Sequence, residues 1–205
     1  MRLILLGAPG SGKGTQAQKI EKNFGAVHIS TGEIIRENIN NKTDIGIKVE
    51  KIINQGKLVP DDVIIELVKD ILNKPNIKNN FVLDGFPRTI KQAEALDKII
   101  QIDKVIYIDT NIDMTKDRML KRRVCPLCGK TYADTLVCPN CNVALSVRSD
   151  DNEQTINSRF EVYKSQTSPL IDFYKQKKLL FKVDGNQNIE QVFEQIKCIL
   201  NEGNI

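Results

Sequence analysis

The pattern Gly-x-x-x-x-Gly-Lys lies near the start of the chain, as Gly7-Ala8-Pro9-Gly10-Ser11-Gly12-Lys13. Glycines at such spacing let backbone N–H groups turn inward around phosphate oxygens, and the lysine can reach the β- and γ-phosphates of a nucleotide. An apolar run precedes the pattern and a helical pattern follows it, so a helix N-terminus would also face the phosphates. We therefore predict a nucleotide phosphate site made of Gly10, Ser11, Gly12, Lys13, Gly14 and Thr15.

One position departs from the general form of this loop. Gly14 follows Lys13, where the pattern has a Ser or Thr that touches Mg²⁺, and Thr15 comes one residue later. The magnesium ion is then expected to be held differently, through water by Asp84 at the end of the third apolar run. An ordinary turn residue at a strand end is the alternative for Asp84.

The second chemical signal is a pair of Cys-x2-Cys motifs separated by nine residues. Four thiolates at this spacing suit tetrahedral Zn²⁺ with no open position, which predicts a structural site; an iron site or redox disulfides are the alternatives. In each motif a proline follows the first cysteine, and Gly129 or Asn142, which tolerate left-handed backbone, follows the second. The predicted ligands are Cys125, Cys128, Cys138 and Cys141.

Composition limits the classes of protein. The 205 residues are 40% hydrophobic and 27% charged with a net charge of +4, which suits a globular protein that handles phosphates. No run approaches the about 18 apolar residues of a membrane span, and no signal peptide is evident, so we expect a cytoplasmic protein without a membrane partner. The basic stretch KRRVC at 121–125 allows a zinc-ribbon nucleic-acid-binding ATPase as a remote alternative, but aromatic residues make up only 5%.

Alternating strand and helix patterns must position these residues. Nearly continuous apolar runs predict strands buried on both faces of a parallel sheet, at 2–7, 26–30, 81–85, 105–109 and 179–185. Helical patterns occupy 13–24, 89–100 and 188–201. The expected fold is a doubly wound α/β domain, in which a parallel five-stranded sheet is flanked by helices.

Two segments interrupt this alternation. Residues 31–72 contain no strand-like run and are expected to be helical, beginning at Thr31 behind the capping box Ser30-x-x-Glu33. Residues 122–159 carry the cysteines, and 131–137 are expected to form a short β-hairpin. Two isolated side chains have structural interpretations: Cys198 in the core on the apolar face of the last helix, and His28 as a packed histidine.

Six motifs occur in the order found in adenylate kinases: GAPGSGKGT, ISTGEIIR, GKLVPDDV, LDGFPRTIKQAEAL, RRVC and RSDDNEQTINSR. The chain resembles the bacterial, long-lid members of that family with a four-cysteine zinc-binding lid. The resemblance implies reversible phosphoryl transfer from Mg·ATP to AMP, giving two ADP, by a monomer. It further implies a core of residues 1–29, 60–121 and 160–205, an AMP-binding insertion at 30–59, and a zinc-bearing lid at 122–159.

The same resemblance assigns roles to individual residues. Catalytic groups would be Lys13, Arg88, Arg122, Arg148 and Arg159. Beyond the loop, ATP would contact Arg118, Arg122, Thr131, Tyr132 and Gln187. AMP would contact Thr31, Arg36, Lys57, Leu58, Val59, Gly85, Phe86, Pro87, Arg88, Gln92, Arg148 and Arg159, with a cis peptide at Phe86–Pro87. A kinase for UMP, CMP or GMP is the nearest alternative.

Overall fold

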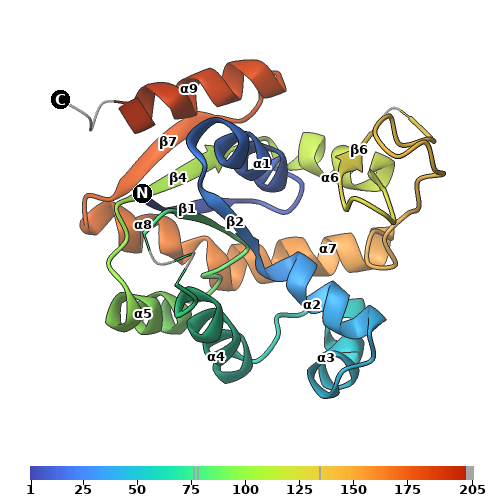
Figure 1. Ribbon diagram of the computed structural model, residues 1–205, viewed down its shortest axis with the longest axis horizontal. Coiled ribbons are helices and arrows are strands. Elements are labelled where there is room, and N and C mark those ends of the chain that lie inside the picture. The colour runs from blue at the N-terminus through green and yellow to red at the C-terminus, as the bar shows by residue number, and fades with distance from the viewer. Residues whose placement is uncertain (76, 78, 134, 202–205) are drawn as a thin grey trace.

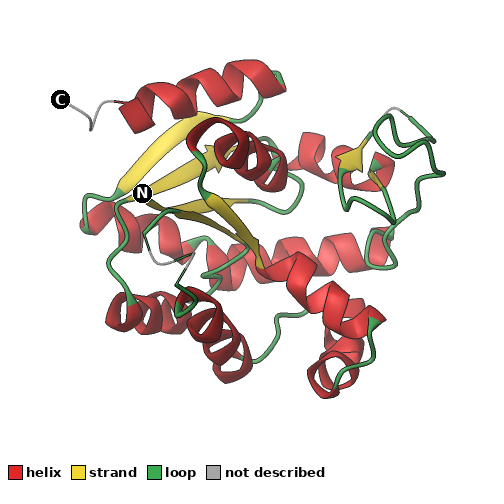
Figure 2. Cartoon of the chain, in the orientation of Figure 1, coloured by secondary structure: helices red, strands yellow, loops and turns green. Residues whose placement is uncertain are grey.

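A computed structural model describes residues 1–75, 77, 79–133 and 135–201. Its centre is a sheet of five strands in the order β2-β3-β1-β4-β7, in which every neighbouring pair is parallel (Figures 1 and 2). The strands are β1 (Arg2–Gly7), β2 (Val27–Ser30), β3 (Phe81–Asp84), β4 (Lys104–Asp109) and β7 (Leu180–Asp184). The predicted doubly wound parallel sheet is confirmed.

Alternation along the strands builds a core on each face of the sheet, because successive side chains point to opposite sides. Leu3 and Leu5 pack against α1 (Lys13–Phe24) and α9 (Ile189–Asn201). Ile4 and Leu6 lie in the opposite cluster, which also contains residues of α4 (Asp61–Leu72), α5 (Ile90–Ile99) and α8 (Pro169–Gln176). Helices on both faces explain why the strands are mostly apolar.

The segment after β2 is helical, as predicted. It forms α2 (Thr31–Asn40) and α3 (Asp44–Asn54) before α4. The Ser30 hydroxyl accepts the Glu33 N–H at 3.4 Å, so the capping box begins α2 at Thr31. Thr43 caps α3 in the same way through the Gly46 N–H at 3.1 Å.

The cysteine segment (residues 122–159) projects from the sheet after α6 (Ile112–Lys121) and returns through α7 (Glu153–Val162) (Figure 1). The hairpin predicted within 131–137 is wrong in its pairing. Strand β6 (Thr131–Tyr132) pairs antiparallel with β5 (Arg123–Val124), while Val137 bridges Ala144. Each Cys-x2-Cys turn reverses the chain, so the β5–β6 pair and the Val137–Ala144 bridge form across these turns. Residue 134, within the predicted hairpin, lies outside the described residues.

The chain from α7 to α8 passes through one π-helical turn, η1 (Tyr163–Thr167). The Ser168 N–H donates to the Tyr163 carbonyl at 2.8 Å, five residues back. Pro169 lacks an N–H and its ring crowds the carbonyl four residues earlier, which favours this widened turn.

Cys198 is exposed, which contradicts its predicted place in the core. The buried stripe of α9 is Val192, Phe193, Ile196 and Leu200. Position 198 lies half a turn away from Ile196 and Leu200, so its side chain faces solvent. Among the described helices, none is both long and apolar enough to cross a membrane.

Candidate active site and metal centre

A cavity of about 1040 Å³ opens at the carboxyl end of the parallel strands. It is lined by the loop after β1, the turn after β3, α2, the cysteine segment and the loop after β7. Sites in open α/β sheets lie at this edge. Of the residues predicted from the sequence, the lining includes Gly10, Ser11, Gly12, Lys13, Gly14, Thr15, Arg36, Leu58, Asp84, Gly85, Pro87, Arg88, Arg118, Arg122, Thr131, Tyr132, Arg148, Arg159 and Gln187.

The loop after β1 has the backbone that phosphate binding requires. Gly10 and Gly12 have φ of +80° and +90°, and a Cβ at Gly10 would lie 2.5 Å from the Thr115 carbonyl oxygen. The Lys13 ammonium donates to the carbonyls of Gly7 and Ala8, both at 2.8 Å, so it lies across the mouth of the loop. Burial lowers the pKa of Lys13 to about 8, against the opposing effect of Asp84. An incoming phosphate would raise this pKa again.

Asp84 occupies the space beside Gly14. Its Oδ2 lies 3.4 Å from where a Cβ at Gly14 would stand, which is van der Waals contact. The His28 Nε2 lies 3.7 Å from the same oxygen. Burial alone would raise the pKa of Asp84, but His28 and Lys13 bring the pKa below its usual range. The carboxylate therefore stays ionised at the head of α1.

Arginines from several segments converge on the cavity. Arg36 comes from α2, Arg88 follows β3, Arg148 lies in the cysteine segment, and Arg159 is on α7. Burial and the nearby Arg122 and Arg36 lower the pKa of Arg148 to about 9. Guanidinium groups held this close repel one another unless an anion lies between them, so the arrangement is suited to a polyphosphate.

Two buried carboxylates hold part of this cluster. Arg122 donates through Nε to Asp151 at 2.7 Å and through Nη2 to its other oxygen. Arg159 donates through Nη1 to Asp150 at 2.8 Å and to Asp151 at 3.3 Å. The side chain of Asp151 is fully buried. These pairs fix two guanidinium groups at the rim of the cavity before any ligand arrives.

The turn after β3 carries the predicted cis peptide at Phe86–Pro87, which is confirmed. Arg88 donates through Nε to the Gly85 carbonyl and through its backbone N–H to the Gln92 Oε1, both at 2.7 Å. Gln92 donates through Nε2 to Asp61 at 2.7 Å, and only 2% of the residue is exposed. Its predicted contact with a base stays a prediction, since it does not line the cavity.

The other predicted nucleotide contacts vary in position. Thr31 is buried and donates to the Asp84 carbonyl at 3.4 Å, and Phe86 and Val59 belong to the core. Lys57 is exposed. Thr31, Lys57, Val59 and Phe86 are not part of the cavity lining. Arg118, on α6, donates to the Gly185 carbonyl at 3.5 Å, and the Gln187 side chain accepts from Gln195 at 2.9 Å.

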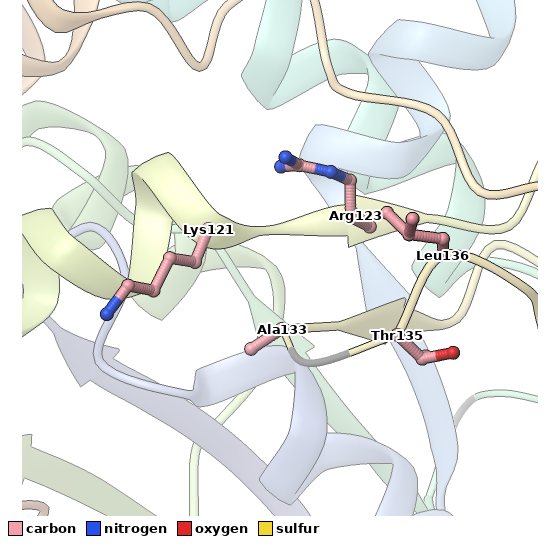
Figure 3. A pocket seen from close by; sticks show the side chains of 5 residues that line it. All are labelled: Lys121, Arg123, Ala133, Thr135 and Leu136. Carbon is pink, nitrogen blue, oxygen red and sulfur yellow. The ribbon is translucent and has the colours of Figure 1, made fainter.

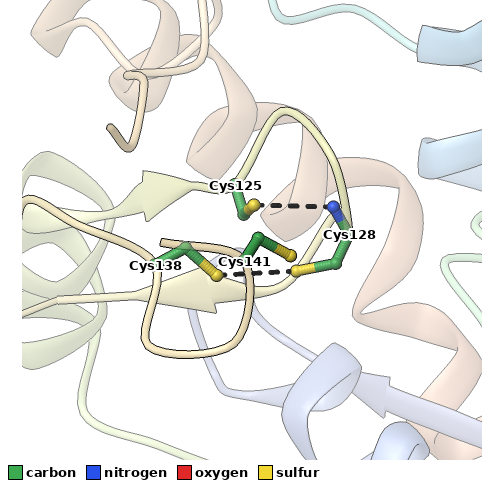
Figure 4. A group of neighbouring side chains, drawn as sticks. All are labelled: Cys125, Cys128, Cys138 and Cys141. Atoms are coloured by element: carbon green, nitrogen blue, oxygen red, sulfur yellow. Dashed lines mark hydrogen bonds between the residues drawn. The ribbon is translucent and has the colours of Figure 1, made fainter. Parts of the chain in front are cut away.

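The four cysteines of the two motifs meet in one cluster (Figure 4). All four Sγ atoms lie within 4.8 Å of one another, and those of Cys128 and Cys138 are 3.7 Å apart. Tetrahedral coordination with metal–sulfur bonds of about 2.3 Å places sulfurs about 3.8 Å apart, so the cluster fits a metal ion. Gly129 and Asn142 have φ of +69° and +53°, which confirms the left-handed positions predicted after each motif.

Comparison with known proteins decides the family. A model of the family described as adenylate kinase matches residues 5–179. The chain belongs to the adenylate kinase family. Three curated adenylate kinases are similar to the chain over nearly their whole length. That of Caldicellulosiruptor bescii is 48% identical over 208 residues, covering 96% of this chain and 97% of the relative. That of Finegoldia magna is 47% identical over 216 residues, covering 99% and 100%, and that of Clostridium novyi is 47% identical over 208 residues, covering 96% of each.

A smaller pocket, of about 240 Å³, adjoins the cavity of this family member on the side of the cysteine segment. Figure 3 shows its lining, and Ala133 and Thr135 line both spaces. The charged ends of Lys121 and Arg123 lie apart from each other in this view (Figure 3). The pocket is therefore an extension of the large cavity toward β6.

Sequence reasoning missed several groups that shape the site. His28 was interpreted as a packed histidine, and it is packed, but it also contacts Asp84. Asp150 and Asp151 received no role, although two consecutive acids beside Arg148 could have signalled partners for the arginines. Asp61 gave no signal, because its contact with Gln92 depends on how α4 packs beside α5.

Proposed function

We propose that this protein transfers the terminal phosphoryl group of Mg·ATP to AMP, reversibly, giving two ADP. The observation that carries the proposal is one cavity in which the phosphate loop meets arginines from α2, the turn after β3, the cysteine segment and α7. Phosphoryl transfer needs two phosphate groups in line and neutralisation of the charge between them. Such a reaction serves purine nucleotide interconversion and energy balance.

On the ATP side, the loop from Gly10 to Thr15 would hold the β- and γ-phosphates, with Lys13 turning from the loop carbonyls to the phosphates. Arg118, Thr131, Tyr132 and Gln187 would surround the base and ribose. All of these residues line the cavity, which supports the assignment.

On the AMP side, Arg36 and Arg88 would bind the phosphate. Residues 57–59, Thr31, the Gly85–Pro87 turn and Gln92 would form the base side of the site. We propose 30–59 as the AMP-binding insertion and 122–159 as a lid on the core made of 1–29, 60–121 and 160–205. Arg122, Arg148 and Arg159 would then meet the transferring phosphoryl group. Since a phosphate oxygen of AMP is already ionised at neutral pH, the reaction needs no general base.

Magnesium would be held with ATP, through water, by Asp84. The contact of Asp84 with the position of Gly14 supports this, because the carboxylate lies beside the position at which the general loop carries its Ser or Thr. The ion would neutralise charge on the β- and γ-phosphates.

The four-cysteine cluster would hold one structural Zn²⁺ through Cys125, Cys128, Cys138 and Cys141. Four sulfurs leave no open position, so zinc would supply rigidity and no reaction step. A four-thiolate site suits a reducing compartment, which favours the cytoplasm. Because residues that we assign to both nucleotides line one cavity of a single chain, a monomer would suffice, and we propose no nucleic-acid or membrane partner.

An assay of ADP formation from Mg·ATP with AMP, UMP, CMP or GMP as acceptor tests the proposal. We expect turnover with AMP at least about a hundredfold above that with the other monophosphates. Activity on UMP or GMP but not on AMP would overturn it. Salt-sensitive binding of RNA or DNA without AMP-dependent ATP turnover would instead favour a nucleic-acid-binding ATPase.

A further inference from the structure

The peptide groups on both sides of Arg88 are held by side chains from two other parts of the chain. Its N–H donates to Gln92 Oε1 at 2.7 Å, and its carbonyl accepts the Thr167 hydroxyl at 2.9 Å. The Arg88 Nε donates to the Gly85 carbonyl at 2.7 Å. Within the part of the chain that the structure describes, no hydrogen bond engages the two Nη atoms of Arg88. Those two atoms are therefore available to bind a ligand.

Thr167 contacts Arg88 from the π-helical turn. It is the last residue of η1, it is half-buried, and it lines the cavity. The helix before this turn carries Arg159, whose charge acts on Arg88. The continuous helical segment α7–η1 thus places Arg159 in the cavity lining and the Thr167 hydroxyl on the Arg88 carbonyl. Widened turns of this kind recur at functional sites.

The Gln92 side of the arrangement is fixed by Asp61. Asp61 Oδ1 accepts Gln92 Nε2 at 2.7 Å and the Thr89 hydroxyl at 3.1 Å. If the Gln92 amide flipped, its NH₂ would face the Arg88 N–H and its oxygen would face the Asp61 carboxylate, which are two repulsive contacts. The carboxylate therefore fixes Gln92 Oε1 in place as the acceptor for Arg88.

We propose that Thr167 and Asp61 are positioning residues for Arg88, which they hold so that its two Nη atoms meet the phosphate of the acceptor nucleotide. The inference rests on the proposed function, in which Arg88 binds that phosphate. A guanidinium group binds phosphate well only at bidentate geometry, and small displacements of a positioning group weaken such contacts strongly. Neither residue needs to touch the nucleotide for this effect.

The test compares the affinities of the full-length protein for AMP and for adenosine, measured by NMR titration. Adenosine lacks the phosphate, so a displaced Arg88 weakens AMP binding alone. Thr167→Val should weaken AMP binding about fivefold, the effect of one neutral hydrogen bond, and leave adenosine binding and the KM for ATP unchanged. Thr167→Ser, which keeps the hydroxyl, should restore AMP binding. Ser165→Ala, in the same turn with its hydroxyl on the Glu161 carbonyl, is the matched control and should match wild type.

Asp61→Ala should weaken AMP binding about tenfold, because a charged acceptor is lost. Asp61→Asn retains an acceptor oxygen and should lose less. Unchanged AMP affinity in Thr167→Val and Asp61→Ala, or an equal loss for AMP and adenosine, would overturn the positioning role. Arg88→Ala separates the two claims. If Arg88→Ala leaves the ratio of AMP affinity to adenosine affinity unchanged, the phosphate role of Arg88 fails. If it lowers this ratio while the other variants do not, only the positioning role fails.

Discussion

The nucleotide cavity and the cysteine cluster are built in opposite ways. The cavity collects side chains from β1 to the loop after β7, and the sheet edge brings them together. The cysteine cluster collects four ligands within residues 125–141, by two local turns of nearly identical sequence. One site depends on the whole fold, and the other can form almost on its own.

The two regions also differ in electrostatics. In the cavity, the pKa values of Lys13, Arg88, Arg148 and Arg159 are all lowered, with burial as the main cause. Positive groups that are held against their own repulsion are suited to bind anions. The cysteine cluster gathers four sulfur atoms, which bind a cation as thiolates. We infer that the cavity carries the chemistry and the cluster carries local stability.

The largest expected effect is a loss of turnover without a loss of stability, in Lys13→Ala or Arg88→Ala. Each removes a charge that we assign to the phosphates, so AMP-dependent turnover should fall about a thousandfold. The thermal midpoint should stay near that of wild type, because burial disfavours both charges more than Asp84 favours them, so their pKa values are lowered. Coupled ADP-formation kinetics and thermal unfolding measure both. Lys98→Ala, an exposed lysine on α5, is the control. Near-normal turnover in either cavity variant would refute its role.

A smaller effect on rate is expected from the double variant Cys125→Ser, Cys128→Ser. It should release about one zinc per chain and lower the thermal midpoint by about 5–10 °C, with phosphoryl transfer at moderate temperature partly retained. Metal analysis measures the zinc content, thermal unfolding the midpoint, and kinetics the rate of phosphoryl transfer. Cys198→Ser should change none of these, because Cys198 is exposed and outside the cluster. A wild-type midpoint in the double variant, together with no zinc in the parent, would contradict a structural metal.

The smallest expected effect is the uptake of protons when ATP binds. The pKa of Lys13 is about 8 in the nucleotide-free protein, and a bound polyphosphate should raise it. ATP binding at about pH 8.5 should therefore take up part of a proton, and affinity should fall as pH rises above 8. Well below pH 8 the lysine is already charged and contributes no uptake. Calorimetry in buffers of different ionisation enthalpy measures this. Lys13→Met should abolish the uptake, and proton release in wild type would contradict the assignment.

Local rules explain what the sequence could predict. The five strands, the loop after β1, the Ser30 cap and the left-handed residues after each cysteine motif depend on neighbouring residues only. The π-helical turn at Tyr163–Thr167 was not predicted, because it depends on how α7 meets Pro169. The contact of His28 with Asp84 and that of Asp61 with Gln92 depend on packing between elements. Cys198 was predicted to lie on the apolar face of the last helix, but it lies half a turn away from the buried residues Ile196 and Leu200.

A crystal structure with a dinucleotide that joins ATP and AMP in one molecule tests the central claim most directly. We predict that it fills the cavity, with one phosphate group at Lys13, the acceptor phosphate at Arg36 and Arg88, and zinc bound by the four cysteines away from both. A dinucleotide bound outside the loop after β1, or a metal at the cysteines in contact with the phosphates, would contradict the separation of chemistry from structure.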